Sequence, residues 1–165
     1  MYMDVYVIVL RLLHILGGVF WAGALFSIVS FVQPTAKRAG MPGGQFVGRL
    51  MGEGRFGQAM GGAAIITILS GGLLFARTFG GSAPVSGPMI GFSIGAVAAV
   101  VAWLLGFIVL FPAARRMGPL SARIEQGEDV GAEMGRLVAT QTRWTQVTAW
   151  LVLIAVLTMA TARYW

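Results

Sequence analysis

Four long apolar stretches dominate the chain, and the segments between them hold most of its charged residues. The stretches run over residues 5–32, 57–77, 88–112 and 144–163. A helix of about 20 residues crosses the hydrocarbon core of a bilayer, so each stretch is long enough to span it. None of them alternates apolar and polar positions as the strands of a membrane β-barrel do. The pattern predicts an all-α integral membrane protein, a four-helix bundle that forms one domain over residues 1–165.

The composition excludes the other broad classes of protein. Hydrophobic residues make up 57% of the chain and charged residues 11%, and the mean hydropathy is +0.80. Soluble domains carry roughly 25% charged residues, and a disordered chain would hold far fewer large apolar residues. The first stretch is too long for a cleaved signal peptide and has no basic start, so we expect it to remain as a span. The partner that this composition requires is a lipid bilayer.

The basic residues are unevenly distributed among the connecting segments. The segments after the first and third stretches hold Lys37, Arg38, Arg49, Arg55, Arg115, Arg116, Arg123, Arg136 and Arg143. The segment after the second stretch offers only Arg77. Lys and Arg mark the cytoplasmic side, which predicts that both termini lie on the outer side of a bacterial inner membrane. The net charge of +6 is therefore expected to contact lipid headgroups, and no nucleic acid.

The two basic connecting segments carry secondary-structure signals of their own. Glycines interrupt the first, where only residues 45–51 are expected to form a short interfacial turn. In the second, residues 120–126 have a helical pattern that Gly127 stops. Acidic residues then favour a new helix start, and this helix is expected to run unbroken from Val130 into the fourth stretch.

Small residues recur at helical spacing, and the fourth stretch has a polar face. Pairs such as Gly18 and Ala22 let two helices approach closely. Such glycines could instead make room for a flat cofactor or a second subunit.

Gln141, Thr145 and Thr148 share one helix face at the start of the fourth stretch. These three side chains either line a small polar pocket or form hydrogen bonds across helices.

Two ionisable residues within the first stretch are candidates for chemistry, because such groups are costly inside a membrane. Arg11 and His14 are three residues apart and share a helix face in the outer half of the bilayer. A neutral imidazole is an axial ligand for haem iron, and a guanidinium one turn nearer the surface suits a haem propionate. Alternatively, Arg11 extends to the headgroups, and His14 bonds to another helix. Candidate partners for that bond are Ser70, Ser93 and Thr158.

Other chemistries have fewer suitable residues. The chain has no cysteine and one histidine, which excludes disulfides, thiolate sites and multi-histidine metal motifs within one chain. Copper remains an alternative because methionine binds Cu(I). The methionines expected toward the outer face are Met1, Met3, Met89 and Met159. The sequence shows no nucleophile–base pair or carboxylate dyad, so hydrolytic chemistry is not expected.

Three segments resemble those of a known membrane-protein group. Residues 13–23, LHILGGVFWAG, resemble the first-helix signature of the CopD-like proteins, in which Trp-x-Gly begins seven residues after a histidine. Residues 70–74, SGGLL, and 159–164, MATARY, resemble the second-span pattern and the endings seen in the same group. The group includes copper-resistance D domains, HemJ-type protoporphyrinogen oxidases and small four-helix proteins.

The resemblance implies a cofactor site around one histidine. It implies that His14 is the haem ligand and metal-binding residue, with Trp21 and Gly23 as its neighbours in the cofactor-binding site. The HemJ-type enzymes use a lysine of the second helix beside the histidine. The only lysine here is Lys37, in a connecting segment, so the resemblance does not extend to that oxidase activity.

The leading hypothesis is therefore a haem b protein with a redox or diatomic-gas-handling role, served by a quinone or another redox partner. One histidine allows three arrangements of the second ligand. The sixth position of the iron is open, a methionine such as Met89 or Met159 fills it, or two copies of His14 meet in a homodimer. The alternatives are a copper-handling membrane protein and a structural or assembly subunit without a cofactor.

Overall fold

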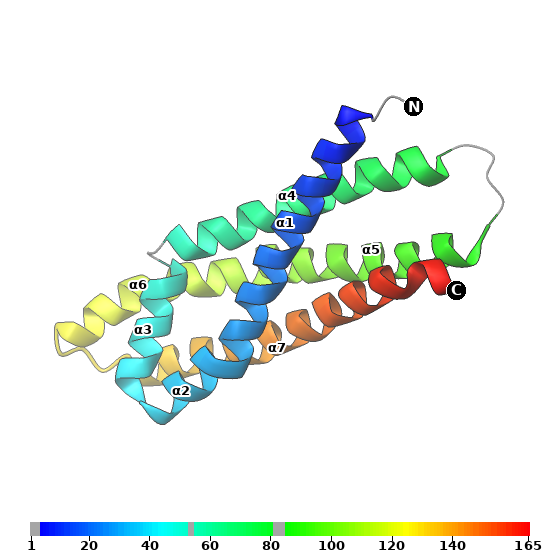
Figure 1. Ribbon diagram of the computed structural model, residues 1–165. Helices are drawn as coiled ribbons and strands as arrows, with labels where there is room; N and C mark the ends of the chain where they lie inside the picture. The colour runs from blue at the N-terminus through cyan, green and yellow to red at the C-terminus, as the bar shows by residue number, and fades with distance from the viewer. Residues whose placement is uncertain (1–3, 53–54, 81–84) are drawn as a thin grey trace.

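The computed structural model describes residues 4–52, 55–80 and 85–165, and every secondary-structure element in these ranges is helical (Figure 1). The segments long and apolar enough to cross a membrane are Val5–Arg38, Arg55–Phe79, Gly87–Glu125 and Gly131–Tyr164. Each of them contains one of the four predicted stretches. The predicted class, an all-α bundle of membrane-spanning helices, is confirmed.

The long helices pack as two pairs. They are α1 (Val5–Ser27), α4 (Arg55–Phe79), α5 (Gly87–Leu105) and α7 (Gly131–Thr161). α1 packs mainly on α4, and α5 packs mainly on α7, while contacts between α4 and α5 join the two pairs. Figure 1 shows that α1 crosses the other three obliquely. The first half of α1 therefore has fewer neighbours than the second.

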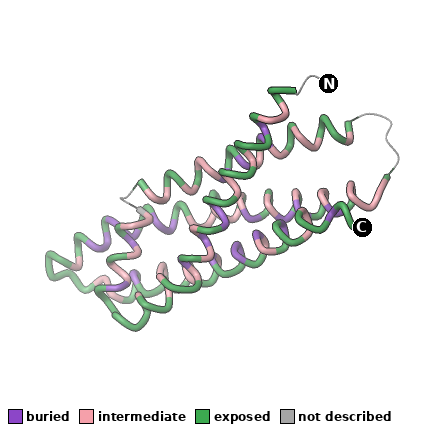
Figure 2. Tube along the Cα trace, viewed as in Figure 1, coloured by how far each residue is buried: buried purple, intermediate pink, exposed green. Residues whose placement is uncertain are grey.

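The main core lies where the second half of α1 reaches the other long helices. It contains Trp21 and Leu25 of α1, Ala64 of α4, Ala102 of α5 and Val152 of α7. Toward its N-terminus, α1 is mostly exposed or half-buried (Figure 2). An apolar helix can remain exposed in this way because lipid tails are as apolar as its side chains.

Two prolines shape the first and third membrane segments. A π-helical turn at Ile28–Val32 ends two residues before Pro34, and another at Gly106–Leu110 ends two residues before Pro112. Proline has no N–H and its ring collides with the carbonyl four residues earlier, and a π-turn is one way for a helix to accommodate such a break. The chain thus stays helical beyond the ends predicted for both stretches.

A second packed unit, which we call the basic end, lies at the far end of the bundle. It consists of α2 (Gln33–Arg38), α3 (Met41–Gly52), α6 (Phe111–Glu125) and the first turns of α7. Its buried centre is formed by Met117, Leu120 and Met134. The connecting segments are therefore folded against each other.

The prediction of only a short turn at residues 45–51 was wrong, because α3 covers the twelve residues Met41–Gly52. Its glycines permit close packing. A Cβ at Gly43 would collide with the backbone of Ala36, and one at Gly48 would lie 3.4 Å from Cβ of Met117. The cost of glycine within the helix is offset by contacts that no larger residue would allow.

The two other local predictions are confirmed. Residues 120–126 include the last turns of α6, although this helix begins at Phe111. Gly127 follows with a φ of +84°, a conformation that favours glycine. α7 then runs unbroken for 31 residues from Gly131.

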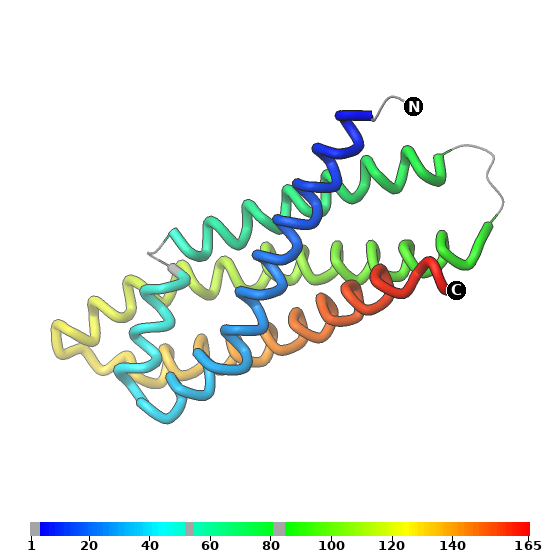
Figure 3. The backbone as a smooth tube through the Cα atoms, viewed as in Figure 1, coloured from blue at the N-terminus to red at the C-terminus, as the bar shows by residue number. Residues whose placement is uncertain are grey.

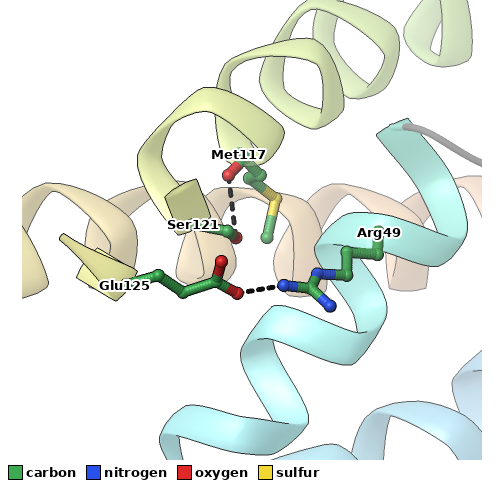
Figure 4. Close-up of polar contacts among 4 residues, drawn as sticks. All are labelled: Arg49, Met117, Ser121 and Glu125. Carbon is green, nitrogen blue, oxygen red and sulfur yellow. Dashed lines mark hydrogen bonds and ion pairs between the residues drawn. The ribbon is translucent and has the colours of Figure 1, made fainter. Parts of the chain in front are cut away.

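Polar contacts tie α3 to α6 at the basic end (Figure 4). The guanidinium of Arg49 pairs with the carboxylate of Glu125, and both side chains are 53% exposed. Beside them the hydroxyl of the buried Ser121 donates to the Met117 carbonyl at 3.0 Å. The ion pair lies at the surface, whereas Met117 and Ser121 form the interior.

Both termini lie at the opposite end of the molecule, as Figures 1 and 3 show. Arg77 at the end of α4 pairs with Asp4 before α1. A Cβ at Gly87, where α5 begins, would collide with the backbone of Trp165. We call this the terminal end.

Candidate functional site

His14 lies on α1 against the middle of α4. Its Nδ1 is 2.8 Å from the carbonyl oxygen of Thr67, and the ring packs on Gly71, where a Cβ would lie 2.6 Å from Cε1. The hydroxyl of Ser70 donates to the Ile66 carbonyl at 2.5 Å and lies 3.2 Å from the Thr67 carbonyl. Two of the three segments that resemble the CopD-like group, those around His14 and around Gly71, are therefore in contact.

This contact assigns the ring nitrogens of His14. A carbonyl oxygen can only accept, so Nδ1 carries the proton and Nε2 holds the free lone pair. Nε2 would be 3.6 Å from a Cβ on Gly71, farther than Cε1 at 2.6 Å or Nδ1 at 2.8 Å. Of the two ring nitrogens, the one with the lone pair is therefore the farther from Gly71 of α4.

The bond from His14 to another helix, which the sequence offered as the alternative to haem ligation, is present, but its predicted hydroxyl partners were wrong. All three of those hydroxyls donate to carbonyls of their own helices: Ser70 to Ile66, Ser93 to Met89 and Thr158 to Ile154. A Ser or Thr hydroxyl in a helix can donate to the backbone carbonyl one turn earlier in the same helix. The nearby backbone of α4 therefore supplies the acceptor.

The other predicted site residues lie apart from this contact. Arg11 is one turn toward the N-terminus and exposed. Trp21 is 6% exposed and belongs to the main core, about 10 Å along the helix from His14 at a rise of about 1.5 Å per residue. Gly23 is exposed, and a Cβ there would meet nothing within 4 Å. The structure brings His14 together with Thr67 and Gly71, which the sequence did not single out as its direct neighbours.

The described residues include no group of three or more His, Cys, Asp or Glu side chains that could hold a metal ion. A bare metal ion usually takes several ligands from the protein, whereas the porphyrin of haem brings four nitrogens and needs only an axial ligand. Met159 packs on Gly95 between α5 and α7, whereas His14 packs on α4. A lone imidazole with a free Nε2 fits haem better than it fits copper.

A separate cavity of about 410 Å³ lies nearer the basic end. Its walls come from all four long helices, from the start of α6 and from the end of α3. Most of its lining is apolar, and one edge is formed by Gln141, Thr145 and Thr148 of α7. The hydroxyls of Thr145 and Thr148 bond within α7, so of the two interpretations of this polar face the structure favours the pocket.

Sequence reasoning missed the wall opposite that polar edge. It is formed partly by Gly57, Gly61 and Gly62 of α4 and by Gly106. A Cβ at Gly61, Gly62 or Gly106 would meet nothing within 4 Å. The sequence feature that could have indicated this wall is the high density of glycines in α4. That density alone does not show whether a glycine allows a neighbouring helix to pack closely or leaves an open space.

Comparisons with protein-family models, curated proteins and solved structures found no match to this chain. The resemblance to the CopD-like group therefore stays a prediction that rests on its three short segments.

Proposed function

We propose that the protein binds b-type haem through Nε2 of His14 and has a redox or diatomic-gas-handling role. The observation that carries the proposal is the 2.8 Å contact of Nδ1 with the Thr67 carbonyl. Metal-ligating histidines almost always donate their other ring nitrogen to such an acceptor, which fixes the tautomer and orients the ring. When bound, haem supplies one-electron transfer or an iron site for a diatomic gas.

Three residues of the chain support this role of His14. The Thr67 carbonyl accepts the Nδ1 proton, and Gly71 leaves space for the ring. Arg11, one turn nearer the terminal end, is exposed, so its planar guanidinium can pair with a propionate.

A second ligand for the haem would come from a methionine such as Met89 or from another copy of the chain, or would be absent. His14 is the only histidine. It is half-buried, and its Nε2 is the ring nitrogen farther from Gly71 of α4. Two-fold symmetric dimers are the commonest oligomers, and a homodimer about this face would direct two imidazoles toward one iron.

The charge distribution supports an orientation in a bacterial inner membrane. Nine of the 12 basic residues belong to α2, α3, α6, the start of α4 and the first half of α7. Placing this basic end in the cytoplasm satisfies the positive-inside rule and puts both termini outside. His14 then lies in the outer half of the bilayer, where a quinone or an outer redox protein can approach.

The visible absorption spectrum of detergent-purified protein, expressed with ample haem, tests the proposal. We expect a Soret band in the wild type that is lost in His14→Ala and His14→Asn. The Asn variant keeps a donor for the Thr67 carbonyl, so its thermal unfolding should stay closer to wild type than that of the Ala variant. Added imidazole should restore the band in His14→Ala, because it can occupy the space that the side chain leaves.

A colourless wild-type protein would sink the proposal, and its metal content would then decide between the alternatives. About one copper per chain would indicate copper handling. A metal-free, well-folded protein would mean that the His14–Thr67 contact only ties α1 to α4.

A further inference from the structure

The described part of the lining of the cavity near the basic end carries no charged side chain. Among the residues that the structure describes, the polar side chains in the lining are Gln58, Gln141, Thr145, Thr148 and the indole N–H groups of two tryptophans. A charge placed there would be costly without a partner. Its volume of about 410 Å³ is within the usual size of small-molecule sites. The occupant that fits is a small neutral molecule.

One wall of the cavity carries parallel aromatic rings. Trp103 and Phe107 are stacked with centroids 6.1 Å apart, and Phe107 and Phe111 follow at 6.5 Å with an angle of only 4° between their planes. Trp21 contributes another ring to the lining. Aromatic faces of this kind favour a planar ring in offset-stacked or edge-to-face contact.

The polar edge offers acceptors for hydrogen bonds. Thr145 and Thr148 donate their hydroxyl protons to the carbonyls of Gln141 and Trp144, at 2.6 and 2.9 Å, so only their oxygen lone pairs remain for a ligand. Gln141 is 7% exposed, and its Oε1 has no hydrogen-bond partner among the described residues. A buried acceptor without a partner is costly. A half-turn of the terminal amide exchanges its oxygen and nitrogen and would bring this oxygen to the cavity, where a ligand that donates a hydrogen bond would remove that cost.

The cavity also reaches the lipid-facing surface. Phe107, Phe111 and Ile65 line it and are 63%, 50% and 44% exposed. Gly61 and Gly62 of α4 also line it, and a Cβ at either would meet nothing within 4 Å. A molecule dissolved in the bilayer can therefore enter between α4 and α5 without passing through water.

From this combination we infer that the cavity binds a neutral, lipid-soluble aromatic molecule that carries a hydroxyl group, such as a phenol or the ring of a hydroquinone. The ring packs on Trp103 and Phe107, and the hydroxyl donates to the oxygen of Gln141. His14 is not among the lining residues, so this binding does not depend on haem.

Photolabelling of the membrane-reconstituted protein tests this binding directly. The probe is 3-hydroxybenzophenone, a neutral photoreactive phenol, and its control is 3-methoxybenzophenone, which cannot donate a hydrogen bond. We expect adducts on peptides that contain Met51 or Met60, both in the lining. The methoxy compound should label roughly fivefold less, the effect of one lost hydrogen bond.

A matched pair of variants locates the site. Gly62 and Gly72 both lie on α4, and at each a Cβ would meet nothing within 4 Å, but only Gly62 lines the cavity. Gly62→Leu should fill the cavity and abolish labelling, whereas Gly72→Leu should label like the wild type. Gln141→Leu should remove the preference for the hydroxyl probe, and His14→Ala should change nothing.

Three outcomes would overturn the inference. Adducts spread evenly over lipid-facing helices in every variant would mean that only lipid enters the cavity. Equal labelling by the two probes in the wild type would show that the hydroxyl is not recognised. No labelling of the lining peptides in the wild type would show that the phenol does not enter the cavity.

Discussion

Gly71 lies directly under the imidazole of His14, and this contact gives a test at the scale of one residue. A Cβ there would be 2.6 Å from Cε1 and 2.8 Å from Nδ1 of His14. Gly71→Ala should therefore displace the ring and lower the free energy of unfolding by about 1–3 kcal/mol, the usual cost of overpacking. The adjacent Gly72, with nothing within 4 Å, should tolerate alanine with a change below about 1 kcal/mol.

Thermal unfolding of both variants in the same detergent is the measurement. If haem is bound, Gly71→Ala should also shift or weaken the Soret band, and Gly72→Ala should not. Equal melting temperatures for the two variants would show that His14 does not pack on Gly71 as described.

At the residue scale, the sequence predicted the candidates better than their partners. His14 stands out because it is the only histidine and lies in an apolar helix. Its partner could not be predicted, since a backbone carbonyl is present at every position and only the crossing of α1 over α4 selects that of Thr67. The hydroxyls that seemed the natural partners bond within their own helices.

At the scale of elements, the contact between α3 and α6 depends on close packing and far less on the visible ion pair. Arg49 and Glu125 are both 53% exposed, and exposed pairs contribute from nothing to about 1 kcal/mol. Gly48 lies under Met117 and Ser121, which are 1% exposed. Gly48→Leu should destabilise the basic end by about 1–3 kcal/mol, and Arg49→Ala by less than about 1 kcal/mol.

Hydrogen exchange of α3 and α6 amides, compared between these two variants, reports on this contact. Faster exchange in Gly48→Leu than in Arg49→Ala is expected. The opposite order would assign the stability of the basic end to the Arg49–Glu125 pair.

Elements were predictable where one physical effect dominates. Long apolar runs predict the spans, and Gly127 with its φ of +84° ends a helix as glycine signals usually do. The extent of α3 was not predictable, because the propensity of its glycines opposes a helix and only tertiary contacts with Ala36 and Met117 explain them. The π-turns before Pro34 and Pro112 were missed as well, although the prolines themselves were the signal.

At the scale of the whole molecule, the helical membrane class follows from composition, but the arrangement does not. Hydropathy says nothing about the oblique path of α1 (Figure 1) or about the space left between α4 and α5. Both depend on which small residues meet across the helices. The space beside Gly95 is filled by Met159 of α7, whereas a Cβ at Gly62 would meet nothing within 4 Å. No local sequence feature distinguishes the packed glycine from the one beside open space.

The orientation of the molecule in its membrane is testable because the chain has no cysteine. Val85 near the terminal end is 76% exposed, and Gln126 in the basic end is exposed as well. A membrane-impermeant maleimide should label Val85→Cys in intact spheroplasts of a bacterial host, and Gln126→Cys only after the membrane is permeabilised. The reason is that the basic residues favour retention of their end in the cytoplasm. The reverse pattern would place His14 in the cytoplasmic half of the bilayer, and any electron donor or gas would then have to reach it from inside the cell.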